Sequence, residues 1–495
     1  MLPVLAGEAS PPGSEPAGDC CEACAAARAA AHAFVPAAVR AAEPPTDRRP
    51  LPMFGPAIRQ GVGIARSGDR RIAFGGLVVA ALFVALAMAS LLLPPAVRLG
   101  SWLPVHLVLA GAATTAIAAI LPFFTAALVV APPAHPAVRI GGIGLVASGA
   151  LAVTTAYGPA GGQPIPAALG GGVFLAGLGL VAAATFTPIR GALGPRRALF
   201  QRAYAVALAC VAVGATLATL VVGGNPAVGA AWGSLKPAHA WLNLVGFAGL
   251  VIVTTLLHLA PTVVGTRLRP RASGRLAVIG LALGAPLIAT GYALEQDVVA
   301  RAGAVAALAG ALGVAAHGLA IHLDGDRGRW TTDAGWHRFT SLSLLAGGGW
   351  LGLGLGVAAA RVLAFGSNPA GWSLSVLVGP LLIGGVTQVL VGAMTHLLPA
   401  IGPGDPIRHA AQRRLLGRAA AVRLTMVNAG ALLVAVGSGP AAAPGAGAAE
   451  GTLVSLGLAC TTIGIGSSIG LLGLAARPGP PTRFSAYGES ATGRG

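Results

Sequence analysis

The chain has 495 residues, of which 55% are hydrophobic and only 9% are charged, and its mean hydropathy is +0.78. Soluble domains carry about 25% charged residues, so this composition excludes a water-soluble fold and predicts an all-α protein embedded in a lipid bilayer. The net charge of +17 does not indicate nucleic-acid binding, because the basic residues are spread over short loops instead of being gathered on one domain.

The first region, residues 1–71, is expected to be a mostly disordered cytoplasmic tail. It is rich in Pro, Ala, Arg and Glu and has no sustained periodicity. Cys20, Cys21 and Cys24 lie in this tail at CCxxC spacing. Thiolates at this spacing hold zinc or copper(I) in many proteins, but a structural site needs about four ligands. Unpaired thiols are therefore the favoured interpretation.

Twelve apolar segments follow within residues 72–477, and a short cytoplasmic tail, residues 478–495, ends the chain. A membrane-spanning helix needs about 20 apolar residues, and each segment is close to that length. We expect the spans at 72–97, 103–131, 138–158, 165–187, 203–223, 238–262, 275–295, 299–323, 335–363, 372–400, 421–438 and 451–477.

The basic residues predict the direction of the chain. If the N-terminus lies in the cytoplasm, 28 of the 32 Lys and Arg residues fall on the inner side. Inner loops of membrane proteins carry such an excess. We therefore expect both termini in the cytoplasm and a multi-pass protein of a bacterial cytoplasmic membrane.

Weak internal similarities indicate a four-helix repeat. His258 and His396 each precede a Leu and a Pro near the inner ends of the sixth and tenth spans. His106 and His239 lie near the outer ends of the second and sixth spans, at nearly the same separation along the chain. A period of about 135 residues predicts three four-helix units with pseudo-threefold symmetry. Chance recurrence of Leu and Pro is the alternative.

His106 and His239 are the main candidates for chemistry. Their two helices run in the same direction, so both imidazoles reach a similar depth near the outer face. Two neutral imidazoles from different helices can ligate haem iron or copper. Asn243 and Gly246 follow His239 at i+4 and i+7 and should share its face, which suits a cofactor or plain helix packing. Two interfacial histidines bonded to water or loops are the alternative.

The inner histidines are weaker candidates. His258 lies so far along the sixth span from His239, roughly 28 Å at the rise of an α-helix, that these two cannot share a metal. His317 and His322 are expected to point to different sides of their helix. Because no tight ligand spacing occurs in this group, structural roles are favoured, with His258 and His396 kept as weaker metal ligands.

Three stretches of the sequence are similar to a known group of membrane proteins. The longest resembles the pattern HxxLNLxGfvGL…GTLxxxxPT of bacterial proteins related to haem–copper oxidase subunit I and to NnrS-type haem–copper proteins. Actinobacterial members of that group can be joined to copper nitrite reductase or multicopper oxidase modules. The similar stretches are 239–250 with 254–256 and 261–262, then 103–112, and finally 388–393 with 398–399.

The resemblance implies a twelve-helix fold with an inner N-terminus, His106 as a ligand of haem b, and His239 as a copper or haem ligand. It also implies a periplasmic copper or cytochrome redox partner. The chain departs from oxygen-reducing members: the span 275–295 has no histidine, the outer half of 372–400 has no HxH, and no tyrosine follows His239 at the family's cross-linked position. A role in electron transfer, nitric-oxide and denitrification handling, or copper homeostasis is therefore expected, without the full oxygen-reducing centre.

Two other functions remain open. The spans are rich in glycine and hold no carboxylate at mid-depth, while Asn243 and Gln388 supply isolated amides. These features favour a carrier or channel for a small neutral or hydrophobic solute. The other open function is that of a scaffold for the assembly of a copper enzyme.

Overall fold

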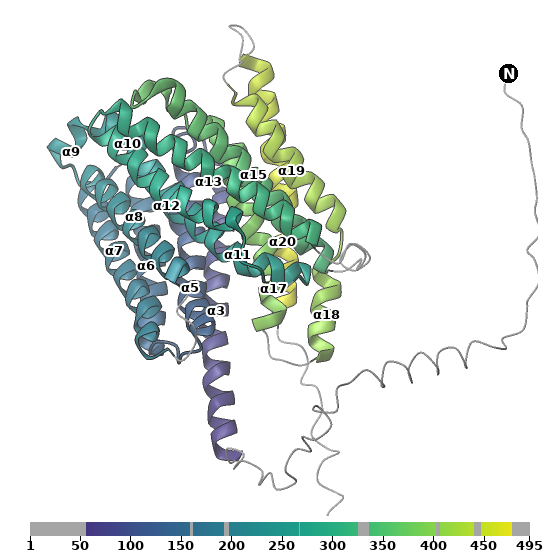
Figure 1. Cartoon of the computed structure of the whole chain (residues 1–495). Helices are drawn as coiled ribbons and strands as arrows, with labels where there is room; N and C mark the ends of the chain where they lie inside the picture. Colours follow the sequence, from purple (N-terminus) through teal and green to yellow (C-terminus); the bar gives the residue numbers. More distant parts are fainter. Residues whose placement is uncertain are drawn as a thin grey trace, which may run out of the picture. The chain divides into compact units, whose positions relative to one another are not determined.

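The computed structural model describes residues 56–158, 162–192, 198–266, 268–324, 336–401, 406–439 and 447–477. The contacts divide the chain after Gly63. The helices discussed below, drawn in Figure 1, belong to the unit formed by residues 64–495, except that the first of them begins at Pro56. The elements are α3 (Pro56–Ser90), α4 (Trp102–His106), η1 (Leu107–Ala113), α5 (Thr114–Val129), α6 (Pro136–Tyr157), α7 (Pro164–Phe186), η2 (Thr187–Gly191), α8 (Ala198–Val222), α9 (Pro226–Ala230), α10 (Trp232–Ala240), η3 (Trp241–Gly249), α11 (Leu250–Val264), α12 (Ala272–Ala293), α13 (Asp297–Asp324), α15 (Trp336–Phe365), η4 (Pro369–Gly371), α16 (Ser375–Leu377), η5 (Val378–Thr387), α17 (Gln388–Ile401), α18 (Pro406–Leu416), α19 (Ala420–Gly437) and α20 (Gly447–Ala476).

The predicted all-α, polytopic fold is confirmed. Within the described ranges there is no strand, and twelve helical segments are long and apolar enough to cross a membrane. In chain order, spans 1 to 12 are α3; α4, η1 and α5; α6; α7 with η2; α8; α10, η3 and α11; α12; α13; α15; η4, α16, η5 and α17; α19; and α20. The sidedness of the two termini remains a prediction.

The first span differs from its predicted bounds. Its helix begins at Pro56 and not at residue 72, so part of the expected tail is helical, and the apolar crossing begins at Gly68. The helix ends at Ser90 and not at residue 97, ahead of Pro94 and Pro95. Proline lacks a backbone N–H, so it does not continue a helix. The rest of the tail, with Cys20, Cys21 and Cys24, and the C-terminal residues 478–495 lie outside the described residues.

Spans 2, 6 and 10 share two structural features. In each of them 67% of the most apolar window is buried, against 28 to 56% in the other nine spans. Each also contains a π-helical segment, namely η1, η3 and η5. These segments begin at Leu107, Trp241 and Val378, so they recur at close to the predicted period. Because π-helix is rare and favours functional positions, its recurrence supports three related four-helix units.

The cavities are also grouped around spans 2, 6 and 10. One apolar cavity of about 740 Å³ is lined by spans 2, 6 and 10 together with Leu77 of span 1. Three others lie beside it among different sets of spans: spans 2 to 6, spans 6 to 9, and spans 10 to 12 with spans 1 and 2. Spans 2, 6 and 10 therefore form the centre of the bundle, and the other spans pack around them.

Candidate functional site

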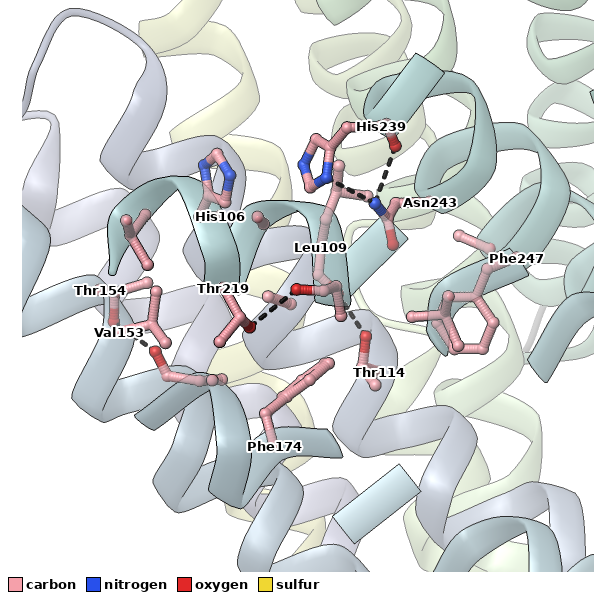
Figure 2. Close-up of a pocket in the computed structure, with 18 residues that line it drawn as sticks. His106, Leu109, Thr114, Val153, Thr154, Phe174, Thr219, His239, Asn243 and Phe247 are labelled. Atoms are coloured by element: carbon pink, nitrogen blue, oxygen red, sulfur yellow. Dashed lines mark hydrogen bonds between the residues drawn. The ribbon is translucent and has the colours of Figure 1, made fainter. Parts of the chain in front are cut away.

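The cavity among spans 2 to 6, which we call the histidine cavity, contains both principal candidate residues. Its space, including the part that opens to the outside, is about 780 Å³. The lining is apolar apart from a few polar side chains, the largest of which are His106, His239 and Asn243 (Figure 2). The structure thus brings together the three residues that the sequence selected.

His106 and His239 face each other from two different helices. Their ring centroids are 6.4 Å apart and the ring planes are inclined by only 17° (Figure 2). His106 ends α4 directly before η1, and His239 lies just ahead of η3. Both rings are therefore presented where the helix changes from α to π hydrogen bonding. The equivalent position of span 10, before η5, carries no histidine.

The hydrogen bonding of His106 leaves one ring nitrogen for a ligand. Its Nδ1 lies 2.7 Å from the backbone oxygen of Trp102. A carbonyl oxygen can only accept, so Nδ1 carries the hydrogen and Nε2 keeps its lone pair. Metal-binding histidines are commonly oriented in this way, through the nitrogen that does not bind the metal.

His239 has the same arrangement with an additional neighbour. Its Nδ1 lies 2.9 Å from the backbone oxygen of Gly214 in α8, which requires hydrogen on Nδ1. The Asn243 Nδ2 donates to the His239 backbone oxygen at 2.8 Å and lies 3.0 Å from the same Nδ1. We assign the hydrogen to Nδ1, because otherwise two lone pairs would face each other across the Gly214 contact. Nε2 of His239 then also keeps its lone pair.

Gly214 and Asn243 are fitted to one another. A Cβ atom at Gly214 would lie 2.3 Å from the Asn243 Nδ2, which is too close for any real contact. The absence of a side chain at Gly214 therefore allows the amide and the imidazole to approach α8. No sequence pattern marks this glycine, since its partners belong to another span.

Aromatic rings hold the two imidazoles from outside. Trp102 stacks on His106 with ring centroids 4.3 Å apart, and Tyr157 lies 5.1 Å from Trp102. Trp232 lies 5.8 Å from the ring of His239. Such contacts restrict side-chain rotation, so both imidazoles are positioned before any ligand binds.

The spacing of the two rings fits a shared metal ion. Because metal–imidazole bonds are about 2 Å long and each ring nitrogen lies about 1 Å from its ring centre, two imidazoles on opposite sides of one ion have centres about 6 Å apart. The observed separation is 6.4 Å. Within the described part of the chain, no group of three or more His, Cys, Asp or Glu side chains could hold a metal ion. Among the described residues, a site here would therefore have no more than two ligands of these four types.

Gly246 does not face the cavity as expected. A Cβ there would lie 2.8 Å from Cys210 Sγ and 3.3 Å from Ala285 Cβ, so Gly246 allows span 6 to pack against α8 and α12. Phe247 and Ala248 line the cavity instead. The reason is η3: i→i+5 hydrogen bonding changes the helical phase, so the i+7 rule fails across this segment.

The inner histidines lie elsewhere. His258 is buried, and its ring makes edge contacts with Phe200 at 4.1 Å and Phe124 at 6.3 Å. His396 lies in α17, and neither His258 nor His396 lines the histidine cavity. The structure therefore separates these two weaker candidates from the principal pair.

His317 and His322 line one cavity of about 410 Å³ among spans 6 to 9 and do not point to different sides. The His322 ring folds back along α13, since its Nδ1 bonds to the Gly318 backbone oxygen at 2.9 Å. A rotamer of this kind brings together side chains that their sequence spacing alone would separate.

Comparisons with known proteins identify no relative: no protein-family model matches the chain, and a search of curated proteins finds no similar sequence.

Proposed function

We propose that this multi-pass membrane protein binds haem b in the histidine cavity, where His106 and His239 would hold the haem iron. One observation carries the proposal: two nearly parallel imidazoles lie 6.4 Å apart, and each is anchored through Nδ1 to a backbone oxygen. In this proposal, the Nε2 lone pairs of His106 and His239 bind one iron. The resemblance of the stretches around both histidines to haem–copper proteins points to the same group.

Haem suits this donor set better than copper alone. A haem brings four nitrogen ligands of its own, so two histidines complete its coordination. Copper held by protein alone usually needs three or more ligands, and the described residues supply two here. The apolar lining of the cavity also suits the faces of a porphyrin.

The pair of ligands favours electron transfer over gas chemistry. If both His106 and His239 held the iron, no ligand position would be left for oxygen or nitric oxide. The haem supplies one-electron redox chemistry when bound, and the chain keeps it in a lipid-enclosed, apolar setting that tunes its potential. We further propose a bacterial cytoplasmic membrane as the location and a periplasmic copper protein or cytochrome as the partner, in denitrification or copper homeostasis.

The test uses the full chain purified in detergent. Its haem and metal contents are measured together with the reduced-minus-oxidised visible spectrum. We expect one haem b per chain in the wild type and none in the double variant His106→Ala with His239→Ala. His135→Asn is a matched control, because His135 is a helix cap away from the cavity that asparagine can replace.

A colourless wild-type protein without bound iron would overturn the proposal. If the wild type bound copper and not iron, and the double variant bound neither, the cavity would be a two-histidine copper site and not a haem site. Solute flux in proteoliposomes that survives both histidine substitutions would favour the carrier hypothesis instead.

A further inference from the structure

A second polar cavity lies between spans 9 and 12, apart from the histidine cavity. Its space, including the part that opens to the outside, is about 200 Å³, the smallest of the cavities described here. Four polar side chains line it: Ser343 of α15, Gln388 of α17, Arg423 of α19 and Ser468 of α20. We call it the Arg423 cavity.

Arg423 carries a buried charge into this cavity. It is only 2% exposed, and among the residues that the structure describes no carboxylate lies within ion-pair distance. Its guanidinium donates to the backbone oxygens of Leu416 and Arg418 and to the Ser468 hydroxyl, while Phe339 covers one face at 3.8 Å. These bonds use three of the five N–H groups. The charge is thus offset by dipoles and not by an opposite charge.

Gln388 is the unpartnered group of the cavity. It is only 3% exposed, and neither the amide nitrogen nor the amide oxygen has a hydrogen-bond partner in the described parts of the chain. Leaving a buried amide unbonded costs about 1–3 kcal/mol per group, so such an amide normally has a ligand or water beside it.

We propose that the Arg423 cavity binds a small monovalent inorganic anion of the size of chloride. The free N–H groups of Arg423 and the amide NH₂ of Gln388 are donors, and donors are what an anion requires. A water molecule would satisfy Gln388 but would leave the buried guanidinium without a counter-charge inside the helix bundle, where an uncompensated charge is costly. The lining of the cavity contains no acidic side chain that would repel an anion. This proposal is independent of haem binding.

The test is thermal unfolding of the detergent-purified full chain in sodium chloride and in sodium gluconate at equal ionic strength. Chloride should raise the midpoint temperature in a saturable way, because a ligand that binds the folded state stabilises it. Gln388→Met should raise the chloride concentration needed for half of the shift by about ten-fold, the loss of one hydrogen bond to an ion.

Gln388→Glu supplies a fixed negative charge beside Arg423. Its midpoint in gluconate should exceed that of the wild type, and added chloride should no longer change it. Arg275→Gln is the matched control, since Arg275 lies in the first turn of α12 as Arg423 lies in the first turn of α19, but outside the Arg423 cavity. It should keep the chloride response. Equal midpoints of the wild type in both salts, or an unchanged response in Gln388→Met, would overturn the proposal and indicate a water-filled cavity.

Discussion

Two cavities of this bundle each contain a pair of histidines, but only one pair is arranged as ligands. In the histidine cavity the two rings come from different central spans, and each uses one nitrogen for a backbone oxygen. In the cavity among spans 6 to 9 both rings come from α13, and each ring nitrogen of His322 faces a backbone oxygen, of Gly318 at 2.9 Å and of Ser341 at 3.4 Å. The hydrogen-bond partners of the ring nitrogens therefore distinguish a pair of candidate ligands better than the mere presence of two histidines in a cavity.

The largest expected effect separates the two pairs directly. His106→Ala and His239→Ala, each alone, should remove or strongly shift the haem absorption band, because each substitution removes one of the two histidines that would hold the iron. His317→Ala and His322→Ala should keep it, measured by the visible spectrum at equal protein concentration. Loss of the band in either of the α13 variants, with the bundle still folded, would show that the α13 histidines also take part in haem binding.

A smaller effect is expected from Gly214→Ala. The new Cβ would lie 2.3 Å from the Asn243 Nδ2, so the amide and the His239 ring must shift. Because contacts that orient a metal ligand are worth about 10–100-fold in affinity, haem binding should weaken by about that factor. Gly172→Ala in α7 is the control, since a Cβ there meets nothing within 4 Å. Equal haem retention in titrations of both variants would contradict the proposed role of Gly214.

The smallest effect is expected from Asn243→Ala. It removes one donor to the His239 backbone oxygen, worth about 1 kcal/mol, while the Gly214 bond still orients the ring. Haem should stay bound with a modest loss of thermal stability. As a control outside the histidine cavity, Asn428→Ala removes a bond to the i−4 oxygen, of Leu424, and also the acceptor of Trp350 Nε1, and it should leave haem binding unchanged. Complete haem loss in Asn243→Ala alone would mean that Asn243, and not the bond to Gly214, determines the orientation of the His239 ring.

Much of the fold could be predicted from the sequence. The apolar segments and their charges are local features, and all twelve spans appear close to the expected positions. The histidines at His106, His239, His258 and His396 also marked a period that the three π segments repeat. The helical start at Pro56 was missed, because a polar helix that leaves the apolar span has no hydropathy pattern.

The site could be predicted only in part. Matched depth on two parallel helices was enough to select His106 and His239, and Asn243 followed from its i+4 spacing. Gly246 was misplaced because a π segment changes the helical phase, which hydrophobic periodicity does not reveal. The partnership of Gly214 with His239 depends on tertiary packing between α8 and span 6. Local patterns contain no such information.

The central claim is that one iron is shared by two imidazoles in nearly parallel planes. Electron paramagnetic resonance of the oxidised protein tests it directly, because the relative orientation of axial imidazole planes determines the symmetry of a low-spin ferric signal. The 17° angle between the rings predicts a rhombic low-spin signal that disappears in both His106→Ala and His239→Ala. A high-spin signal, a strongly axial signal typical of perpendicular rings, or a signal unchanged in either variant would contradict the account.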